Sequence, residues 1–297
     1  MIRSLTCFAA LAGVAITSGC GTTYEVRAIE GSQLSAVAAR HDAISAEPSV
    51  NRPDRDSVAM FNRVRSDVEP VAERFCVEET EAGTNCDYDI GVDPGRSEVN
   101  AYQTYVKGRP TLVFTPGFIS QVGNDHELAY VMGHEAGHHI AGHLDKKETQ
   151  TAIAAGVGAT IGVAILIAAA ASGAQPSEQD VENLVMGGGL LGAAAGSSAY
   201  SQTYELEADM IGAYIAEAAG YDPTIGSAVF PRIAGGDHPE PDSGQAAFWA
   251  THPSSPERLA WAVEVADAIA AARAAGETPT PPKAKELGER IAEALAF

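Results

Sequence analysis

Hydrophobic residues recur at two spacings along the chain, and each spacing predicts one type of element. Over residues 54–75 they recur every three or four positions, as on one face of an amphipathic helix: Val58, Phe61, Val64, Val68, Val71 and Phe75. Alternating or short apolar runs at 88–92, 99–106 and 111–115 predict strands, with a turn at Asp93-Pro94-Gly95.

Helical patterns dominate the rest of the chain. Asn124 or Asp125 can cap a helix that runs to about His143, and further helices are predicted over 200–219 and 256–272. The sequence therefore predicts an α+β fold that is mostly helical, with a small β-sheet. Between the first two of these helices, no charged residue occurs from Thr149 to Ser177.

Charge and composition argue against a nucleic-acid-binding protein and against a disordered one. The chain has 297 residues, with 39 acidic against 19 basic side chains and a net charge of −20. Nucleic acid is therefore not an expected partner, because phosphate binding needs a basic surface. With 45% hydrophobic and 20% charged residues, the composition is that of a folded protein.

The N-terminus has the pattern of an export signal. Arg3 precedes the apolar run from Leu5 to Ile16, and small residues lead to Cys20. We expect a signal peptide over 1–19, a lipidated Cys20 of the bacterial lipoprotein type, and a flexible tether over 20–53. A plain signal peptide that is cut nearby and an uncleaved anchor are the alternatives.

Two cysteines remain in the predicted mature domain. Cys76 and Cys86 are close in sequence, and an exported chain reaches a compartment that permits disulfides. We predict that they pair. The rival interpretation, two zinc ligands, lacks the CxxC spacing of a structural site.

A candidate metal motif lies on the helix that follows the third strand. His134 and His138 are four residues apart, so both imidazoles lie on one face and can reach one ion. Glu135 can reach a water on that ion without binding the ion itself. This is the HExxH arrangement of zinc peptidases, in which zinc acidifies water and the carboxylate accepts its proton. Two surface histidines beside a solvated acid are the alternative.

A catalytic zinc needs a third protein ligand. His139 points about 100° around the helix from His138, so the pair formed by His139 and His143 cannot share the ion. Downstream, Glu205 and Asp209 share one helix face, where a ligand and an acceptor that orients a ligand imidazole would both fit. By itself, this pattern is also that of an ordinary acidic helix face.

Together, His134-Glu135-Ala136-Gly137-His138 and Glu205-Leu206-Glu207-Ala208-Asp209 resemble the HExxH and ExxAD motifs of the HtpX-like and CAAX-prenyl-protease-like gluzincins. The resemblance covers residues 55–270 in order, and the exported lipoprotein branch of BepA-like and LoiP-like proteins is the most similar. Further matching segments are Asn100-Ala101 with the strand 112–115, Glu127-Leu128-Ala129, His143, and Thr251-His252-Pro253 with Arg258. The tail 276–297 is too short for the helical-repeat array of BepA, so no role of that array is carried over.

The resemblance implies a zincin-like metallopeptidase domain over 54–275 that binds one Zn²⁺. It implies that His134, His138 and Glu205 are the zinc ligands, that Glu135 is the general base, and that Asp209 orients a ligand. It also implies that substrate pairs along strand 111–115 as the edge of the sheet.

Two late residues have roles that the resemblance leaves open. The histidine that matches His252 lies near the metal in relatives, where it either stabilises the oxyanion or binds zinc and displaces water. We hypothesise that His252 does both, as a latch; a structural histidine that begins a helix is the alternative. Arg258 either pairs with Asp209 or another acid near the site, or has a purely structural role.

The uncharged segment is long enough to cross a bilayer, since Ala152 to Ala171 rises about 1.5 Å per residue against about 30 Å of hydrocarbon. Its Ala and Gly content, and the position of Lys146 and Lys147 on the exported side, argue against a span. We therefore favour a packed helical hairpin over 149–199 that covers the active-site cleft. A membrane-dipping hairpin and a true span are the alternatives.

Three functions fit these residues. The favoured one is a zinc endopeptidase, whose substrates, by resemblance, are misfolded or stalled envelope proteins. The second is a lipid-anchored assembly or chaperone-like factor with a latched, silent zinc site, and the third is a hydrolase of another amide. We expect the protein on the periplasmic side of the bacterial cell envelope, anchored by lipid to a membrane, the outer in preference to the inner.

Overall fold

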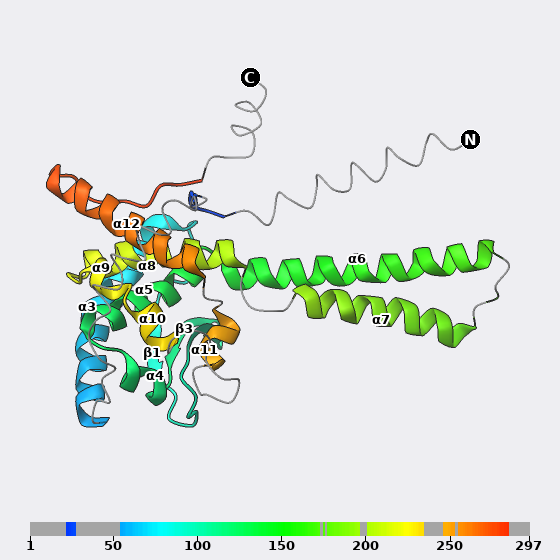
Figure 1. Ribbon diagram of the computed structural model, residues 1–297, viewed down its shortest axis with the longest axis horizontal. Helices are drawn as coiled ribbons and strands as arrows, with labels where there is room; N and C mark the ends of the chain where they lie inside the picture. The colour runs from blue at the N-terminus through cyan, green and yellow to red at the C-terminus, as the bar shows by residue number, and fades with distance from the viewer. Residues whose placement is uncertain are drawn as a thin grey trace, which may run out of the picture. The chain divides into compact units, whose positions relative to one another are not determined.

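A computed structural model describes residues 22–27, 54–172, 175, 177–196, 201–234, 246–252 and 255–284 (Figure 1). The chain divides into two compact units: one contains Gly142–Ala199, and the other contains Thr22–Ala141 and Tyr200–Phe297. The predicted signal peptide and Cys20 lie outside the described residues. The predicted fold class, α+β and mostly helical with a small sheet, is confirmed.

The sheet has three strands, β1 (Asp89–Val92), β2 (Ala101–Val106) and β3 (Arg109–Phe114), in the order β1-β3-β2. β3 runs antiparallel to β2 and parallel to β1. Lys107 and Gly108, with φ of 53° and 80°, form the tight turn of the β2–β3 hairpin.

The expectation that strand 111–115 forms the edge of the sheet is wrong. β3 lies in the centre, and β2 is the edge strand on one side. The hydrophobic pattern did not reveal this, because the order of the strands depends on where β1 adds to the β2–β3 hairpin. Any substrate strand that extends the sheet on the β2 side must therefore pair with residues 101–106.

Helices pack around this sheet. α3 (Asp54–Glu79) buries Val64 and Val68 completely and packs against α5 (Asp125–Ile140). The long helices of the C-terminal half are α8 (Gln202–Ala218) and α12 (Pro256–Ala274), and Trp261 of α12 donates to the carbonyl of Leu206 on α8. The short helices are α4 (Pro116–Gln121), α9 (Pro223–Gly226), α10 (Val229–Ala234) and α11 (Ala246–Thr251).

Glycines bring α5 and α8 into backbone contact. A Cβ atom on Gly133 would lie 2.7 Å from the carbonyl oxygen of Gly212, and one on Gly212 would lie 2.7 Å from the amide nitrogen of His134. A Cβ on Gly137 would lie 3.0 Å from the carbonyl oxygen of Ala208. Because real Cβ atoms are excluded at the shorter distances, only glycine permits this approach, which places the two motif helices side by side.

The disulfide and the chain ends tie the outer parts of this unit together. Cys76 and Cys86 form a disulfide that links the end of α3 to the approach of β1. The expectation of a flexible tether does not hold at residues 22–27: Tyr24 is fully buried and pairs in a β-bridge with Lys283. The tether over 28–53 lies outside the described residues.

Residues 143–196 form two antiparallel helices, α6 (His143–Ala171) and α7 (Glu178–Gly196), and the uncharged segment covers most of α6. They approach closely, since a Cβ on Gly162 would lie 2.3 Å from the carbonyl oxygen of Leu184. Within its own unit the hairpin does not bury all of its large apolar side chains, since Ile161 and Ile167 are 56% and 65% exposed. That it covers the active-site cleft stays a prediction. The stretch His143–Ala169, which contains an 18-residue window with a mean hydropathy of 2.3, is long and apolar enough to cross a membrane.

Candidate metal centre

The residues predicted to hold the metal come from two helices in direct contact. Asn124 caps α5 by accepting a hydrogen bond from the amide of Glu127 at 3.0 Å, and Ser201 caps α8. α5 contributes His134, Glu135 and His138, and α8 contributes Glu205 and Asp209. All five side chains are buried.

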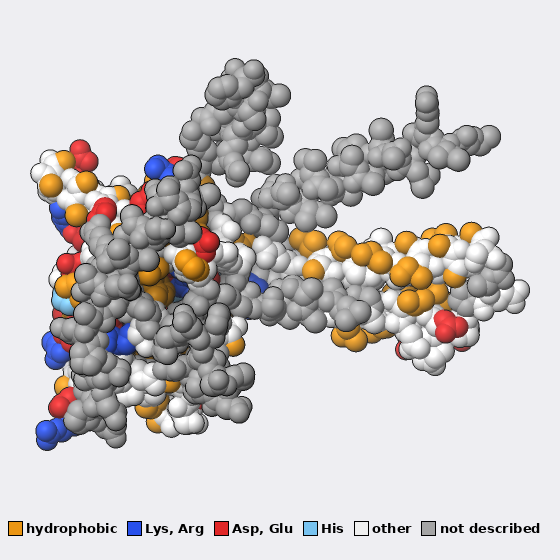
Figure 2. Space-filling view, in the orientation of Figure 1, with side chains coloured by type: hydrophobic (Ala, Val, Ile, Leu, Met, Phe, Trp, Pro, Cys, Tyr) orange, Lys and Arg blue, Asp and Glu red, His pale blue; other side chains and the backbone are white. Residues whose placement is uncertain are grey.

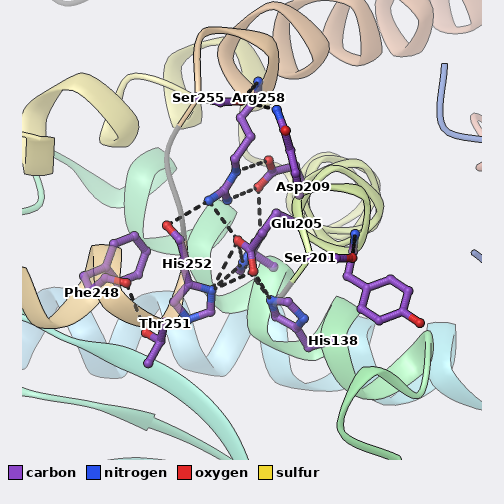
Figure 3. A network of polar contacts seen from close by, with 12 residues as sticks. His138, Ser201, Glu205, Asp209, Phe248, Thr251, His252, Ser255 and Arg258 are labelled. Atoms are coloured by element: carbon purple, nitrogen blue, oxygen red, sulfur yellow. Dashed lines mark hydrogen bonds and ion pairs between the residues drawn. The ribbon is translucent and has the colours of Figure 1, made fainter. Parts of the chain in front are cut away.

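Four donor side chains converge at one point: His134, His138, Glu205 and His252. The Nε2 atoms of His134 and His138 lie 3.0 Å apart, and Nε2 of His138 lies 3.5 Å from Oε1 of Glu205. His252 brings its Nδ1 atom to 3.3 Å from His134 Nε2 and from Glu205 Oε1 (Figure 3). His139 lies outside this group, since its ring contacts the hydroxyl of Tyr105 and the carbonyl of Asn85.

These separations fit a tetrahedral metal ion. Bonds of about 2.0–2.1 Å from zinc to nitrogen or oxygen place neighbouring donor atoms about 3.3 Å apart in a tetrahedron. Donor atoms lie 3.0 Å apart for the Nε2 atoms of His134 and His138, and 3.6 Å apart for His134 Nε2 and Glu205 Oε2. Two imidazoles, a carboxylate and a third imidazole are also the ligand types that zinc prefers.

A second layer of contacts orients the donors. Nδ1 of His134 lies 2.8 Å from Oδ1 of Asp209, which fixes the ring with Nε2 toward the other donors. Arg258 donates to both Asp209 oxygens, at 2.8 and 2.7 Å, and its Nη1 lies 2.8 Å from Oε2 of Glu205. Arg258 therefore pairs with both acids, and it holds Oε2 of Glu205 while both oxygens of that carboxylate face the imidazoles.

The charges of this layer keep the two acids ionised. Burial opposes ionisation of Glu205 and of Asp209, but the Arg258 guanidinium holds the pKa of both carboxyls below the usual values. The same two carboxylates outweigh burial at Arg258 and raise its pKa. The arrangement thus presents an anionic ligand and a charged acceptor among buried side chains.

Glu135 is placed differently from the other acids. Both its carboxylate oxygens are buried without a well-formed hydrogen bond within the described chain, and Oε1 lies 3.5 Å from Nε2 of His252. Burial raises the pKa of Glu135, and His252, His134 and, least of all, the backbone of Gln103 on β2 lower it. A carboxyl whose proton affinity is raised, beside a metal site, is suited to accept and return a proton.

His252 connects the donor group to the sheet. It follows directly after α11, where Phe248, one helical turn earlier, stacks on its ring at a centroid distance of 4.8 Å. Its Nε2 atom lies 3.2 Å from the carbonyl oxygen of Ala101 on the edge strand β2. Carboxylates of Glu205 and Glu135 outweigh burial and raise the pKa of His252.

Residues 59–266 match the profile of Peptidase family M48. The chain belongs to peptidase family M48. No curated protein matches the chain. Family membership and the buried donor group together identify a metallopeptidase, and the resemblance to HtpX-like and CAAX-protease-like members is supported at the level of the M48 family.

Several contacts of this M48 site were absent from the sequence analysis. The ring of Phe248, the carbonyl of Ala101 and the backbone of Gln103 all touch functional groups. Only Phe248 had a signal in the sequence, since it precedes His252 by four residues and so shares its helix face. The other two act through backbone atoms, which no side-chain pattern reveals.

Proposed function

We propose that this M48 chain is a zinc endopeptidase, with one Zn²⁺ per chain, that hydrolyses misfolded or stalled proteins of the bacterial cell envelope. The observation that carries the proposal is the position of Glu135, a buried acid without a well-formed hydrogen bond, directly beside the donors of His134, His138 and Glu205. A non-catalytic metal site has no need for such an acid, since burying it is unfavourable.

Each side chain has a separate task in this reaction. His134, His138 and Glu205 hold the zinc ion, which when bound acts as a Lewis acid toward the scissile carbonyl and the attacking water. Glu135 accepts the proton of the water and later donates it to the leaving amine. Asp209 and Arg258 keep His134 and Glu205 in position and charged.

The edge strand β2 is the proposed substrate platform. An extended peptide that adds to β2 on the side away from β3 forms main-chain hydrogen bonds independent of its side chains. This suits a protease of unfolded chains, whose exposed segments vary in sequence. Glu135 lies near the backbone of Gln103, so a peptide on β2 brings its own backbone close to the proton acceptor.

A second candidate function rests on His252. Its Nδ1 atom lies among the donor atoms, where it would fill the position that an attacking water needs. In this state the site is latched, and the protein acts as an assembly or chaperone-like factor that binds unfolded clients. The proposed endopeptidase requires His252 to move aside when substrate binds, after which it is placed to stabilise the oxyanion.

Location and anchoring are part of the same proposal. The signal-like segment 1–19 and Cys20 support a lipoprotein of the BepA-like and LoiP-like branch, on the periplasmic side and preferably at the outer membrane. Mass spectrometry of the mature N-terminus tests this: a diacylglycerol thioether on Cys20 is expected. An unmodified residue from another position in the chain would contradict it.

Removal and return of the metal test the activity. Dialysis against a strong chelator is expected to abolish hydrolysis of unfolded casein, and one equivalent of Zn²⁺ per chain should restore it. Internal cleavage products separate an endopeptidase from an exopeptidase. Hydrolysis that persists in the zinc-free protein would contradict the proposal, and so would recovery with Mg²⁺ but not with Zn²⁺.

A further inference from the structure

The α6–α7 hairpin exposes more large apolar side chains than the surface of a soluble protein usually does. Five large aliphatic residues of α6 are between 42% and 65% exposed: Val157, Ile161, Val163, Ile165 and Ile167. On α7, Met186 and Leu190 are 59% and 67% exposed. Figure 2 shows hydrophobic side chains running along the hairpin. Monomeric soluble proteins rarely expose apolar surface of this extent.

The exposed apolar positions extend around most of α6. At about 100° per residue, the positions from Val163 through Val157 to Ile165 cover about 200° of the helix. The remaining arc faces α7, where Gly162 meets Leu184 and where Ala155 and Ala159 meet Gly189. α6 therefore has no polar face along this stretch. A helix that is apolar on every side belongs in a protein core or in a bilayer.

Charged residues are confined to the two ends of the hairpin. Lys146, Lys147 and Glu148 precede the uncharged part of α6, and Glu178, Asp180 and Glu182 stand at the start of α7, next to the turn. Between Glu182 and Glu205 the chain is again without charge. The uncharged stretch of α6, residues 149–171, measures about 34 Å at 1.5 Å per residue, against about 30 Å of hydrocarbon.

Two other environments could cover the exposed side chains of α6, and both fit this pattern less well than a bilayer does. A second copy of the chain would cover one side of α6, and a helix in such a four-helix bundle keeps a polar outer face, which α6 lacks. A helix that lies flat in the membrane interface likewise needs a polar face toward water. A bilayer surrounds the helices on all sides, and its two aqueous surfaces accept the two groups of charges.

We propose that the α6–α7 hairpin inserts into a lipid bilayer, with the acidic turn region in the headgroups or water beyond the hydrocarbon. Lys146 and Lys147 then stay at the surface from which the hairpin enters, where anionic headgroups attract them. Their position on the exported side argues against a span inserted from the cytoplasm, not against a hairpin inserted from the exported side. The proposal is independent of catalysis and of the lipid on Cys20. It makes the hairpin a second point of contact with the membrane.

A fluorescent probe at a single position tests this in the full chain. Bimane is attached at Ile161→Cys, and the protein is reconstituted into phosphatidylcholine–phosphatidylglycerol vesicles that carry a nitroxide on the acyl chain. Val77→Cys is the matched control, since Val77 is 69% exposed on α3. Cys76 and Cys86 are paired, and labelling of the unsubstituted chain is subtracted as background.

Insertion predicts at least several-fold stronger nitroxide quenching at Ile161 than at Val77. It also predicts loss of this difference when Ile165→Asp and Ile167→Asp are added, with an unchanged circular dichroism spectrum. Equal quenching at the two positions would overturn the proposal. A probe at Ile161 that is shielded from both the nitroxide and aqueous iodide would overturn it as well, because protein rather than lipid would then surround the helix. The Glu135→Gln variant should give the same quenching, which separates this result from the test of activity.

Discussion

At the scale of single residues, the site depends on how a few polar atoms share partners. Arg258 reaches two carboxylates at once, and Asp209 reaches both Arg258 and His134. Each of these groups is buried, so each stays ionised or oriented only because the others are present. His252 differs from them, since it has an imidazole nitrogen on the donor side and another at the substrate strand.

The latch hypothesis predicts a gain of activity on removal of His252. A competing ligand worth about 1.4 kcal/mol suppresses the rate about tenfold, so His252→Ala should raise basal hydrolysis of casein by about that factor. His139→Ala is the control, because this neighbouring histidine contacts Tyr105 and Asn85 instead and should give no increase. A hundredfold loss in His252→Ala would instead assign the residue to the oxyanion. An unchanged rate would refute both roles.

Arg258 should be essential for stability. Replacement by Leu leaves the carboxylates of Asp209 and Glu205 buried without their cation, which destabilises a protein by about 3–5 kcal/mol. The exposed pair of Arg273 with Glu217 offers the control, since Arg273→Leu should change stability far less than Arg258→Leu does. Urea unfolding of the zinc-free protein measures both. Equal effects of the two substitutions would show that the buried network contributes nothing.

At the residue scale, the sequence predicted those parts of the site in which the spacing of two residues on a helix fixes their relative direction. The four-residue spacing of His134 and His138 gave two donors on one face, and the same spacing placed Glu205 with Asp209. The resemblance joined the two pairs, and the structure brings them together. Sequence could not show that Arg258 binds both acids, because this depends on how the first turn of α12 meets α8.

At the scale of elements, the metal site depends on the close contact between helices α5 and α8. Gly133, Gly137 and Gly212 line this contact, and none of the three has a positive φ that would itself require glycine. Their conformations are ordinary helix, so the reason for glycine is the lack of space. Glycines at these helical positions of the sequence therefore indicate that another backbone packs closely against the helix.

Substitution of Gly212 should disrupt this contact between α5 and α8. An added Cβ meets the backbone of His134 at 2.7 Å, which cannot move without displacing a donor. We expect Gly212→Ala to destabilise the protein by about 1–3 kcal/mol, as overpacking does, and to weaken zinc binding. The control is Gly156→Ala in α6, where nothing lies within 4 Å and helix propensity improves. A Gly212→Ala variant that unfolds and binds zinc like wild type would contradict the close contact.

The sheet shows where the prediction of elements reaches its limit. Each strand was located within a few residues, because alternation reports burial on one face. The strand order was not, since β1 and β2 have similar patterns and pair with opposite sides of β3. The substrate strand was therefore assigned to 111–115, and the structure moves the edge nearest His252 to Ala101–Val106.

At the scale of the whole molecule, the two units account for different parts of the sequence. The unit that holds the metal donors also binds the start of the described chain: Glu207, two residues from Glu205, accepts a hydrogen bond from the amide of Tyr24 at 2.7 Å. This leaves few residues between Cys20 and a buried contact. A lipid on Cys20 would therefore hold this unit close to the membrane surface.

The structure and environment of the uncharged segment were the features that the sequence predicted least well. Length and composition allowed a core helix, a membrane-dipping hairpin or a span, because all three share an apolar sequence. Exposed side chains such as Ile161 and Ile167 favour the two membrane alternatives over a core helix, and exposure is a property of tertiary structure. The described chain thus combines a domain with a buried metal site and a hairpin without a core of its own.

The most direct test of the central claim compares zinc content and proteolysis in wild type and Glu135→Gln. Elemental analysis should find one zinc per chain in both, because Glu135 is not among the donor residues. Hydrolysis of casein should fall by about 10³-fold in Glu135→Gln, as for loss of a general base. Undiminished hydrolysis in the variant, or a wild type without zinc, would contradict the assignment of this site as a zinc peptidase centre.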